Sequence, residues 1–392
     1  MMTSQTTTNG RLSKRVQEIK PSGIRRFFDL ASKMENIISL GVGEPDFVTP
    51  WNVREASISS LERGFTAYSA NAGIIELRRE IAAYMDRRFS VQYDPEQEIL
   101  VTVGASEAID IGMRAILDEG DEVIIVEPSF VSYAPLVQMA GGVPVAVGTK
   151  IEDDFKVSAE QIEAAITPKT KVIMLSFPNN PTGTTMNAAE MHGIAALAER
   201  YDLLVFSDEI YAELSYDADH VSFASLAGMK ERTILISGFS KAFAMTGWRL
   251  GFVLAPPDLL AAMLKIHQYS LMCAPTMAQY GALEALQSGM DDVERMKQSY
   301  KQRRNFVVKS FAEIGLECHI PGGAFYAFPS IASTGLSSEQ FAEKLLLEER
   351  VAVVPGHVFG EGGEGHIRCS YATSMENLEQ AVKRINRLLE RL

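Results

Sequence analysis

The sequence predicts an α/β protein in which a large, mostly parallel, seven-stranded sheet is followed by a smaller α+β part. Short apolar runs rich in Val, Ile and Leu alternate with helical patterns through most of the chain, which is typical of a parallel sheet covered by helices. Polar residues follow several of these runs, at the strand ends where such sheets bind ligands. The predicted strands lie near residues 99, 123, 143, 172, 203, 234 and 250.

The length of 392 residues predicts two cores, because a single core rarely grows past ~250–300 residues. After Pro256-Pro257 the pattern becomes helical over 259–288 and 291–314, and the second of these helices is expected to bridge the two parts. A second small sheet is expected near 317–320, 321–328, 351–354 and 366–370, covered by helices over 337–350 and 375–392. We therefore expect an N-terminal segment over 1–45, a large domain over 46–290 and a small domain over 291–392.

The composition excludes several classes of protein. The net charge of −13 argues against nucleic acid or anionic membranes as partners. Three widely spaced cysteines without a CxxC pair, and histidines without metal-ligand spacing, predict a reducing compartment and no metal site. The polar first ten residues do not resemble a signal peptide, and no apolar run reaches the ~18 residues of a membrane span. We expect a cytoplasmic protein.

The stretch 237–251 holds one lysine, Lys241, between the apolar runs 233–236 and 250–255. A lysine in such a water-poor setting has its charged form disfavoured, which makes its amine a good nucleophile that can hold an aldehyde as a Schiff base. The neighbouring Ser240 and Arg249 suit an anion such as a phosphate. The alternative is a surface-loop lysine beside an unrelated arginine.

The pattern Ser-x-x-Ser-Lys-x-x-x-x-x-Gly-x-Arg-x-Gly at 237–251 resembles the cofactor-lysine signature of class I aminotransferases. These aspartate aminotransferase-like enzymes have fold type I and use pyridoxal 5'-phosphate. Four further segments match in the same order, so that the resemblance extends from about Leu40 to Tyr371. It implies a pyridoxal-phosphate-binding large domain, a homodimer, and an N-terminal segment that lies across the mouth of the active site.

Two N-terminal motifs carry part of this resemblance. The glycines of Gly-Val-Gly-Glu-Pro-Asp-Phe at 41–47 do not form a dinucleotide loop, because the third glycine is missing and Pro45 interrupts the expected helix start. In the family, the glycine corresponding to Gly43 lets a substrate carboxylate approach the backbone. The segment 68–78 matches one whose tyrosine, here Tyr68, reaches the cofactor phosphate of the other subunit.

The turn that follows strand 98–103 predicts a phosphate site, because small residues entering a helix leave backbone N–H groups free. Gly104, Ala105 and Ser106 form this candidate cradle, although a serine here can also be an ordinary N-cap. Phe130, just after the strand near 123, corresponds to the family's aromatic residue that stacks on the pyridine ring. Arg114 lies about two turns into the helix and is either a contact for an acidic substrate or part of a solvated face.

Three more positions correspond to cofactor contacts in the family. The rigid loop Asn-Pro-Thr-Gly at 180–183 places Asn180 to donate to the cofactor's phenolic oxygen. Asp208 ends an apolar strand, where a carboxylate is costly without a partner, and the protonated pyridine nitrogen would be that partner. Tyr211 would share the phenolic oxygen with Asn180. Glu209 and Glu213 are interpreted as ordinary polar residues.

The last predicted contact is Arg368, a cation on an otherwise apolar strand that is costly without an anion. The resemblance implies that Arg368 binds the substrate α-carboxylate with two parallel hydrogen bonds. It also implies that Asn180 and Gly43 lie beside the same substrate. The role of Arg25 in recognising the substrate side chain stays open.

These residues predict a ping-pong aminotransferase that moves an amino group from an L-amino acid to a 2-oxo acid. Aspartate and 2-oxoglutarate are the first hypothesis for the pair, with alanine, aromatic amino acids or acylated diaminopimelate as alternatives. Lys241, Asp208 and Tyr211 would be the catalytic residues. A C–S β-lyase would share the cofactor contacts. A non-catalytic pyridoxal-phosphate-binding regulator is disfavoured by the absence of a basic DNA-binding segment, and an NAD-dependent dehydrogenase by the absence of Gly-x-Gly-x-x-Gly.

Overall fold

A seven-stranded sheet organises the larger part of the chain. The computed structural model describes residues 10–19, 21, 23 and 34–392. All neighbouring strands are parallel except around β8, which runs antiparallel to both its neighbours. This confirms the predicted mostly parallel sheet. Its order is β2 (Ile99–Thr102), β8 (Gly251–Leu254), β7 (Thr233–Gly238), β6 (Leu204–Asp208), β5 (Thr170–Ser176), β3 (Glu122–Glu127) and β4 (Val143–Gly148).

Helices cover both faces of this sheet, because successive side chains of a strand point to opposite faces. In β3, Val123 and Ile125 pack into one buried cluster, whereas Ile124 and Val126 pack into another. The first face is covered by α5 (Gly104–Ile116), α6 (Tyr133–Ala140) and α9 (Pro257–Ser270). The opposite clusters receive side chains from α7 (Ala159–Ala165), α8 (Ala188–Arg200), α4 (Ile75–Phe89), α10 (Thr276–Ser288) and α3 (Trp51–Glu62).

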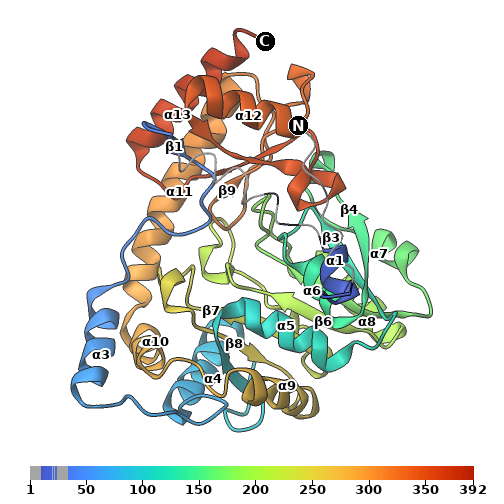
Figure 1. Cartoon of the computed structure of the whole chain (residues 1–392), viewed down its shortest axis with the longest axis vertical. Helices are drawn as coiled ribbons and strands as arrows, with labels where there is room; N and C mark the ends of the chain where they lie inside the picture. Colours follow the sequence, from blue (N-terminus) through green and yellow to red (C-terminus); the bar gives the residue numbers. More distant parts are fainter. Residues whose placement is uncertain (1–9, 20, 22, 24–33) are drawn as a thin grey trace.

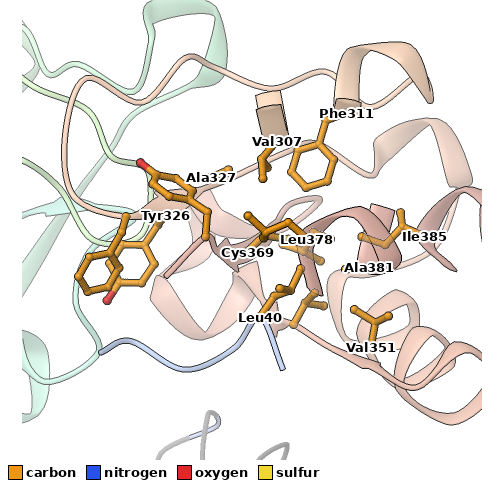
Figure 2. Packing of buried hydrophobic residues seen from close by; sticks show 14 of the residues in the cluster. Leu40, Val307, Phe311, Tyr326, Ala327, Val351, Cys369, Leu378, Ala381 and Ile385 are labelled. Carbon is orange, nitrogen blue, oxygen red and sulfur yellow. The ribbon is translucent and has the colours of Figure 1, made fainter. Parts of the chain in front are cut away.

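A second core lies at the other end of the molecule, where α11 (Met290–Glu313) leads away from α10 (Figure 1). Its three-stranded antiparallel sheet has the order β11 (Val354–Pro355), β12 (Ile367–Ser370) and β9 (Tyr326–Ala327). β10 (Val351–Ala352) pairs in parallel with β1 (Ile38–Ser39), so a segment from near the N-terminus joins this core. Side chains from α11, β12 and α13 meet there (Figure 2). The remaining helices of this core are α12 (Ser338–Glu349) and α13 (Met375–Leu389).

The structure corrects three of the predicted elements. The single helix expected over 259–288 is two helices, α9 and α10, because Met272 has a left-handed backbone and Pro275 begins a new helix as its N-cap. No strand forms over 317–320, and the strand expected over 321–328 is limited to β9. Pro321 and the two following glycines weaken pairing there. The boundaries 1–45, 46–290 and 291–392 stay a prediction.

Two further points concern the ends and surface of the fold. The short helix α1 (Lys14–Glu18) begins at Ser13, whose hydroxyl accepts a hydrogen bond from the Val16 N–H. Among the described residues, no helix is both long and apolar enough to span a membrane.

Candidate active site

A cavity of about 340 Å³ lies where the two cores meet. Most of its walls follow the carboxyl ends of parallel strands, which is why residues far apart in the sequence converge there. The second core contributes Tyr326 and Arg368. Eleven of the predicted site residues line this cavity, whereas Gly104, Tyr68 and Arg114 do not: Gly43, Ala105, Ser106, Phe130, Asn180, Asp208, Tyr211, Ser240, Lys241, Arg249 and Arg368.

The amine of Lys241 points into this cavity. Its Nζ donates a 2.6 Å hydrogen bond to the backbone oxygen of Gly43. Burial, and then the positive charge of Arg368, lower the pKa of the Lys241 amine to about 8. A fraction of the amine is therefore uncharged near neutral pH, and this form can act as a nucleophile or a general base.

The carboxyl group of Asp208 closes the floor of the cavity at the end of β6. Its Oδ2 accepts a 2.7 Å hydrogen bond from the Tyr133 hydroxyl, and its Oδ1 accepts one of 3.2 Å from the Ile210 N–H. Burial raises the pKa of the Asp208 carboxyl to about 6 in spite of these bonds. The described residues form no salt bridge to it within 4.0 Å, so the site favours a cationic partner from a ligand.

Arg368 is a buried cation in the wall of the cavity. Its side chain is buried, with the residue only 4% exposed, and its guanidinium lies over the Tyr326 ring at 4.4 Å. Nη1 donates to Asn180 Oδ1 at 2.9 Å and Nη2 donates to the Gly41 oxygen at 2.7 Å. Its buried Nε has no hydrogen-bond partner among the described residues. A buried cation with an unused donor is suited to a carboxylate.

The start of α5 forms another wall of this cavity. Gly104 has a φ of +76°, which allows the chain to turn from β2 into the helix. A Cβ at this position would lie 2.5 Å from Arg249 Nη2, so the arginine packs directly against the turn. Ala105, Ser106 and Ser240 line the cavity beside them. Free N–H groups, hydroxyls and a guanidinium together make a site for a phosphate.

Comparison with known proteins decides the family. Residues 35–385 match the family described as aminotransferase class I and II. This chain belongs to that family. It is 62% identical over 380 residues to YugH of Bacillus subtilis, which is named as a candidate aminotransferase without a substrate; the match covers 97% of this chain and 98% of the relative.

Two further relatives of this aminotransferase carry substrate names. It is 46% identical to an aspartate aminotransferase of Pyrococcus abyssi over 96% of this chain and 98% of the relative. The crystal structure of an aromatic aminotransferase from Pyrococcus horikoshii superposes with a TM-score of 0.90 and 45% identity, over 94% of this chain and 99% of that one. The chain is thus an aminotransferase of amino-acid metabolism with the predicted fold, close to both aspartate and aromatic aminotransferases.

Sequence reasoning missed several residues of the cavity. The hydroxyl of Tyr326 lies 2.8 Å from that of Tyr211, and Tyr133 bonds to Asp208. Glu44 and Thr246 also line the cavity and are joined by a 3.1 Å hydrogen bond. Tyr326 lies in the stretch 321–328, which the sequence marks only as an expected strand. Tyr133 lies in no motif, and Thr246 is only an unspecified position of the motif at 237–251. The packing of α6 and of the loop after β7 brings them to the site.

Two predicted contacts lie elsewhere. Tyr68 does not line the cavity of its own chain and is 80% exposed. Arg114 lies on the outer part of α5, where its Nε pairs with Asp110 at 3.1 Å, so it does not reach the cavity. The solvated alternative for Arg114 is therefore confirmed. Arg25 lies outside the described residues.

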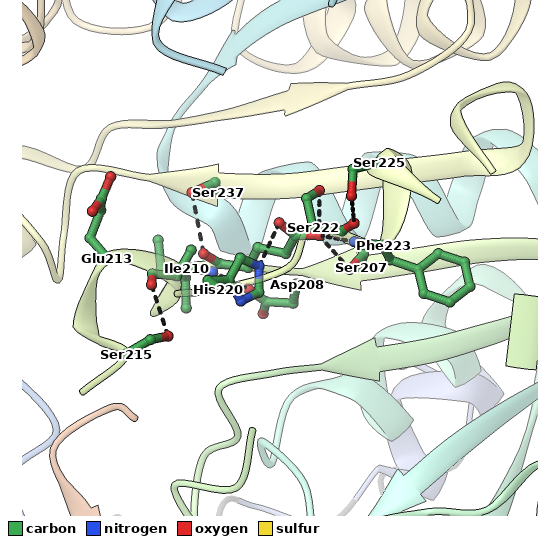
Figure 3. Close-up of polar contacts among 12 residues, drawn as sticks. Ser207, Asp208, Ile210, Glu213, Ser215, His220, Ser222, Phe223, Ser225 and Ser237 are labelled. Atoms are coloured by element: carbon green, nitrogen blue, oxygen red, sulfur yellow. Dashed lines mark hydrogen bonds and ion pairs between the residues drawn. The ribbon is translucent and has the colours of Figure 1, made fainter. Parts of the chain in front are cut away.

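Glu209 and Glu213, interpreted as ordinary polar residues, are both buried and do not line the cavity. Glu209 accepts hydrogen bonds from the hydroxyls of Ser207 and Ser222 and from the Phe223 N–H. These partners gather beside Asp208 and His220 behind the end of β6 (Figure 3). Both carboxylates are fully engaged in structural bonds, Glu213 with Tyr84 and Arg88.

Proposed function

We propose that this aminotransferase uses pyridoxal 5'-phosphate to move an amino group from an L-amino acid to a 2-oxo acid. The family implies the cofactor, and the residues of the cavity fit it. Lys241 offers a partly uncharged amine, and Asp208 offers a buried carboxylate without a cationic partner. The proposal rests mainly on one observation: these two groups line the same cavity as Arg368, whose buried Nε has no hydrogen-bond partner among the described residues.

Each predicted contact then has a place in the holoenzyme. Lys241 would hold the cofactor, Asp208 would face its ring nitrogen, and Phe130 would lie against the ring. Asn180 and Tyr211 would donate to its phenolic oxygen. The phosphate would be bound by the cradle residues Gly104, Ala105, Ser106, Ser240 and Arg249, with Tyr68 added from a second subunit.

The chemistry follows from these positions. Pyridoxal phosphate, when bound, supplies the aldehyde that takes up the amino group and a cationic ring that accepts electron density from the substrate Cα. Arg368 and Asn180 hold the substrate carboxylate, and Gly43 places no side chain beside them; a Cβ there would lie 2.7 Å from the Tyr326 hydroxyl. With its lowered pKa, Lys241 takes the proton from the substrate Cα and later returns it. Both substrates bind in turn at this one cavity, which gives ping-pong kinetics.

Aspartate is our first candidate for the donor and 2-oxoglutarate for the acceptor. The aspartate aminotransferase among the relatives supports this choice, whereas Arg114 no longer does. Aromatic amino acids are the second candidate, because apolar side chains of Ile109, Phe130 and Ile210 line the cavity and a relative is an aromatic aminotransferase.

We infer a homodimer from the surface around Tyr68. The 67–71 segment bonds to the region after α9, where Asn71 Nδ2 donates to the Met272 oxygen at 2.7 Å. Large apolar side chains are exposed on the 67–71 segment and from the end of α9 to the start of α10: Tyr68, Tyr269, Leu271, Met272 and Met277. Large apolar side chains exposed on two segments that contact each other are typical of a protein–protein interface. Light scattering should give twice the chain mass; a monomer that retains full activity would contradict the dimer and the role of Tyr68.

The first experiment is an absorbance spectrum of the protein loaded with pyridoxal phosphate, before and after addition of single amino acids without an acceptor. We expect a visible band that one amino acid converts to the absorbance of the aminated cofactor, with release of its 2-oxo acid. Pyruvate and ammonia accumulating while the band persists would instead indicate the β-lyase.

Lys241→Ala tests the same assignment. We expect loss of the visible band and a fall in kcat of at least about a thousandfold, because the variant lacks both the nucleophile and the proton carrier. Lys309→Ala, at a side chain that is 79% exposed on α11, is the matched control and should behave as wild type. Retention of band and turnover in Lys241→Ala would refute the assignment.

A further inference from the structure

Tyr326 lies at the junction between the two cores and is not among the predicted cofactor or substrate contacts. It lies in β9 and is buried. The guanidinium of Arg368 lies over its ring, with Cζ 4.4 Å from the ring centroid. Its hydroxyl is 2.8 Å from the hydroxyl of Tyr211, which comes from the large sheet. A Cβ at Gly43 would lie 2.7 Å from the same hydroxyl. Tyr326 therefore contacts the substrate-side arginine and the cofactor-side tyrosine at once.

The bond between the two tyrosines can be made in two ways, because each hydroxyl has one hydrogen and can also accept. If Tyr211 donates to Tyr326, the only hydrogen of Tyr211 is used and cannot reach a ligand. If Tyr326 donates to Tyr211, the Tyr211 hydrogen is free to point into the cavity. An anionic oxygen in the cavity favours the second arrangement, because hydrogen bonds to a charged acceptor are roughly twice as strong as neutral ones.

The surroundings also favour Tyr326 as the donor. Burial raises the pKa of both hydroxyls, and it raises that of Tyr211 well above its ordinary value. The positive charge of Arg368 opposes this effect in both tyrosines, but it ranks directly after burial only for Tyr326, whose ring lies against the guanidinium. A hydroxyl beside a cation gives up its hydrogen more readily and is the stronger donor of the two.

We propose that Tyr326 is a positioning residue that donates to the Tyr211 oxygen and so directs the Tyr211 hydroxyl hydrogen toward the cofactor's phenolic oxygen. The inference rests on the proposed function. A chain of two hydroxyl bonds strengthens each bond in it, so Tyr326 makes Tyr211 a better donor. Because its ring also supports Arg368, Tyr326 connects the group that binds the carboxylate with the group that binds the cofactor oxygen.

The experiment is a pH titration of the visible band of the protein loaded with pyridoxal phosphate. Donation to an oxygen favours the unprotonated, anionic form of that oxygen, so a weaker donor raises the pH midpoint of the band. We expect Tyr326→Phe, which keeps the ring and removes only the hydroxyl, to raise the midpoint by roughly half a pH unit. Tyr211→Phe should raise it more.

Two controls make the result specific. Tyr371→Phe removes another buried hydroxyl of the same core, one that bonds to the Ala324 oxygen at 3.3 Å and does not line the cavity, and should leave the midpoint unchanged. Adding Tyr326→Phe to Tyr211→Phe should cause no further shift. A further shift would overturn the claim that Tyr326 acts through Tyr211.

A midpoint for Tyr326→Phe equal to that of the wild type would overturn the inference while leaving the proposed function intact. If no visible band forms in the wild-type protein, the proposed function itself fails. Should Tyr326→Phe not fold, Gly43→Ala tests the same bond, because its added Cβ must displace the Tyr326 hydroxyl. It should raise the midpoint in the same direction, and an unchanged midpoint would again overturn the inference.

Discussion

At the scale of single residues, the site depends on ionisable side chains whose burial costs free energy of folding. Asp208 is buried without a cationic partner, and its folded-state pKa of about 6 lies above the ordinary value of 3.8. The folded protein therefore binds the Asp208 proton more tightly than the unfolded chain does. The resulting stabilisation is complete below about pH 4 and is lost as the pH rises through about 6.

In the cofactor-free protein, a single substitution removes this cost. Asp208→Asn does not titrate, so we expect it to be more stable than the wild type above pH 6, by up to about 3 kcal/mol, and this advantage to vanish near pH 4. Thermal unfolding across this pH range measures the difference. Asp202→Asn, at a side chain that is 95% exposed, should leave the pH dependence unchanged. Equal stability of Asp208→Asn and wild type at pH 8 would contradict the assigned cost of the buried carboxylate.

At the scale of elements, the turn from β2 into α5 decides the shape of the phosphate site. It is built by Gly104, which combines a positive φ with a close approach of Arg249. Both features exclude a side chain, because an L-residue is strained at this φ and its Cβ would displace the guanidinium.

We expect Gly104→Ala to weaken binding of pyridoxal phosphate by roughly tenfold, which corresponds to about 1.4 kcal/mol. Fluorescence titration of the cofactor-free protein measures this affinity. Gly64→Ala is the matched control, because Gly64 has a φ of +78° but nothing within 4 Å of an added Cβ. The same loss of affinity in both variants would show that backbone strain, and not the contact with Arg249, is responsible.

At the scale of the whole molecule, α11 joins the second core to the loop 41–47. Arg303 of α11 is nearly buried, donates to Asp46 Oδ1 at 2.7 Å and lies over the Phe47 ring at 5.3 Å. The backbone oxygens of Gly41 and Gly43 in this loop accept the bonds from Arg368 and Lys241. The ion pair between Arg303 and Asp46 thus helps to hold the loop 41–47, which contacts both Arg368 and Lys241.

We expect Arg303→Gln to raise KM for the amino acid by roughly tenfold while kcat changes by less than about threefold, because the loop is displaced but Lys241 and Asp208 remain. Steady-state kinetics with both substrates separate the two effects. Arg295→Gln, near the start of α11 with a side chain that is 74% exposed, should have wild-type constants. A fall in kcat without a change in KM would contradict the proposed role of the loop.

The α/β class, the seven strands of the main sheet, the family and most residues of the cavity could be predicted from the amino-acid sequence. These follow from local signals: apolar runs of strand length, and motifs such as those at 237–251 and 180–183, whose residues lie close together in the chain. Lys241, Asp208 and Arg368 could be predicted because each is a charged group in an otherwise apolar stretch.

The sequence does not predict which side chains meet across the two cores. Tyr326 and Tyr211 are 115 positions apart, and no local pattern distinguishes them from other core tyrosines. The same holds for Arg114, since the exposed side of α5 becomes known only when the helix packs against the sheet. The burial of Glu209 and Glu213 likewise depends on partners from distant segments. Burial and long-range contacts depend on which distant segments pack against each other. A local residue pattern does not encode this packing.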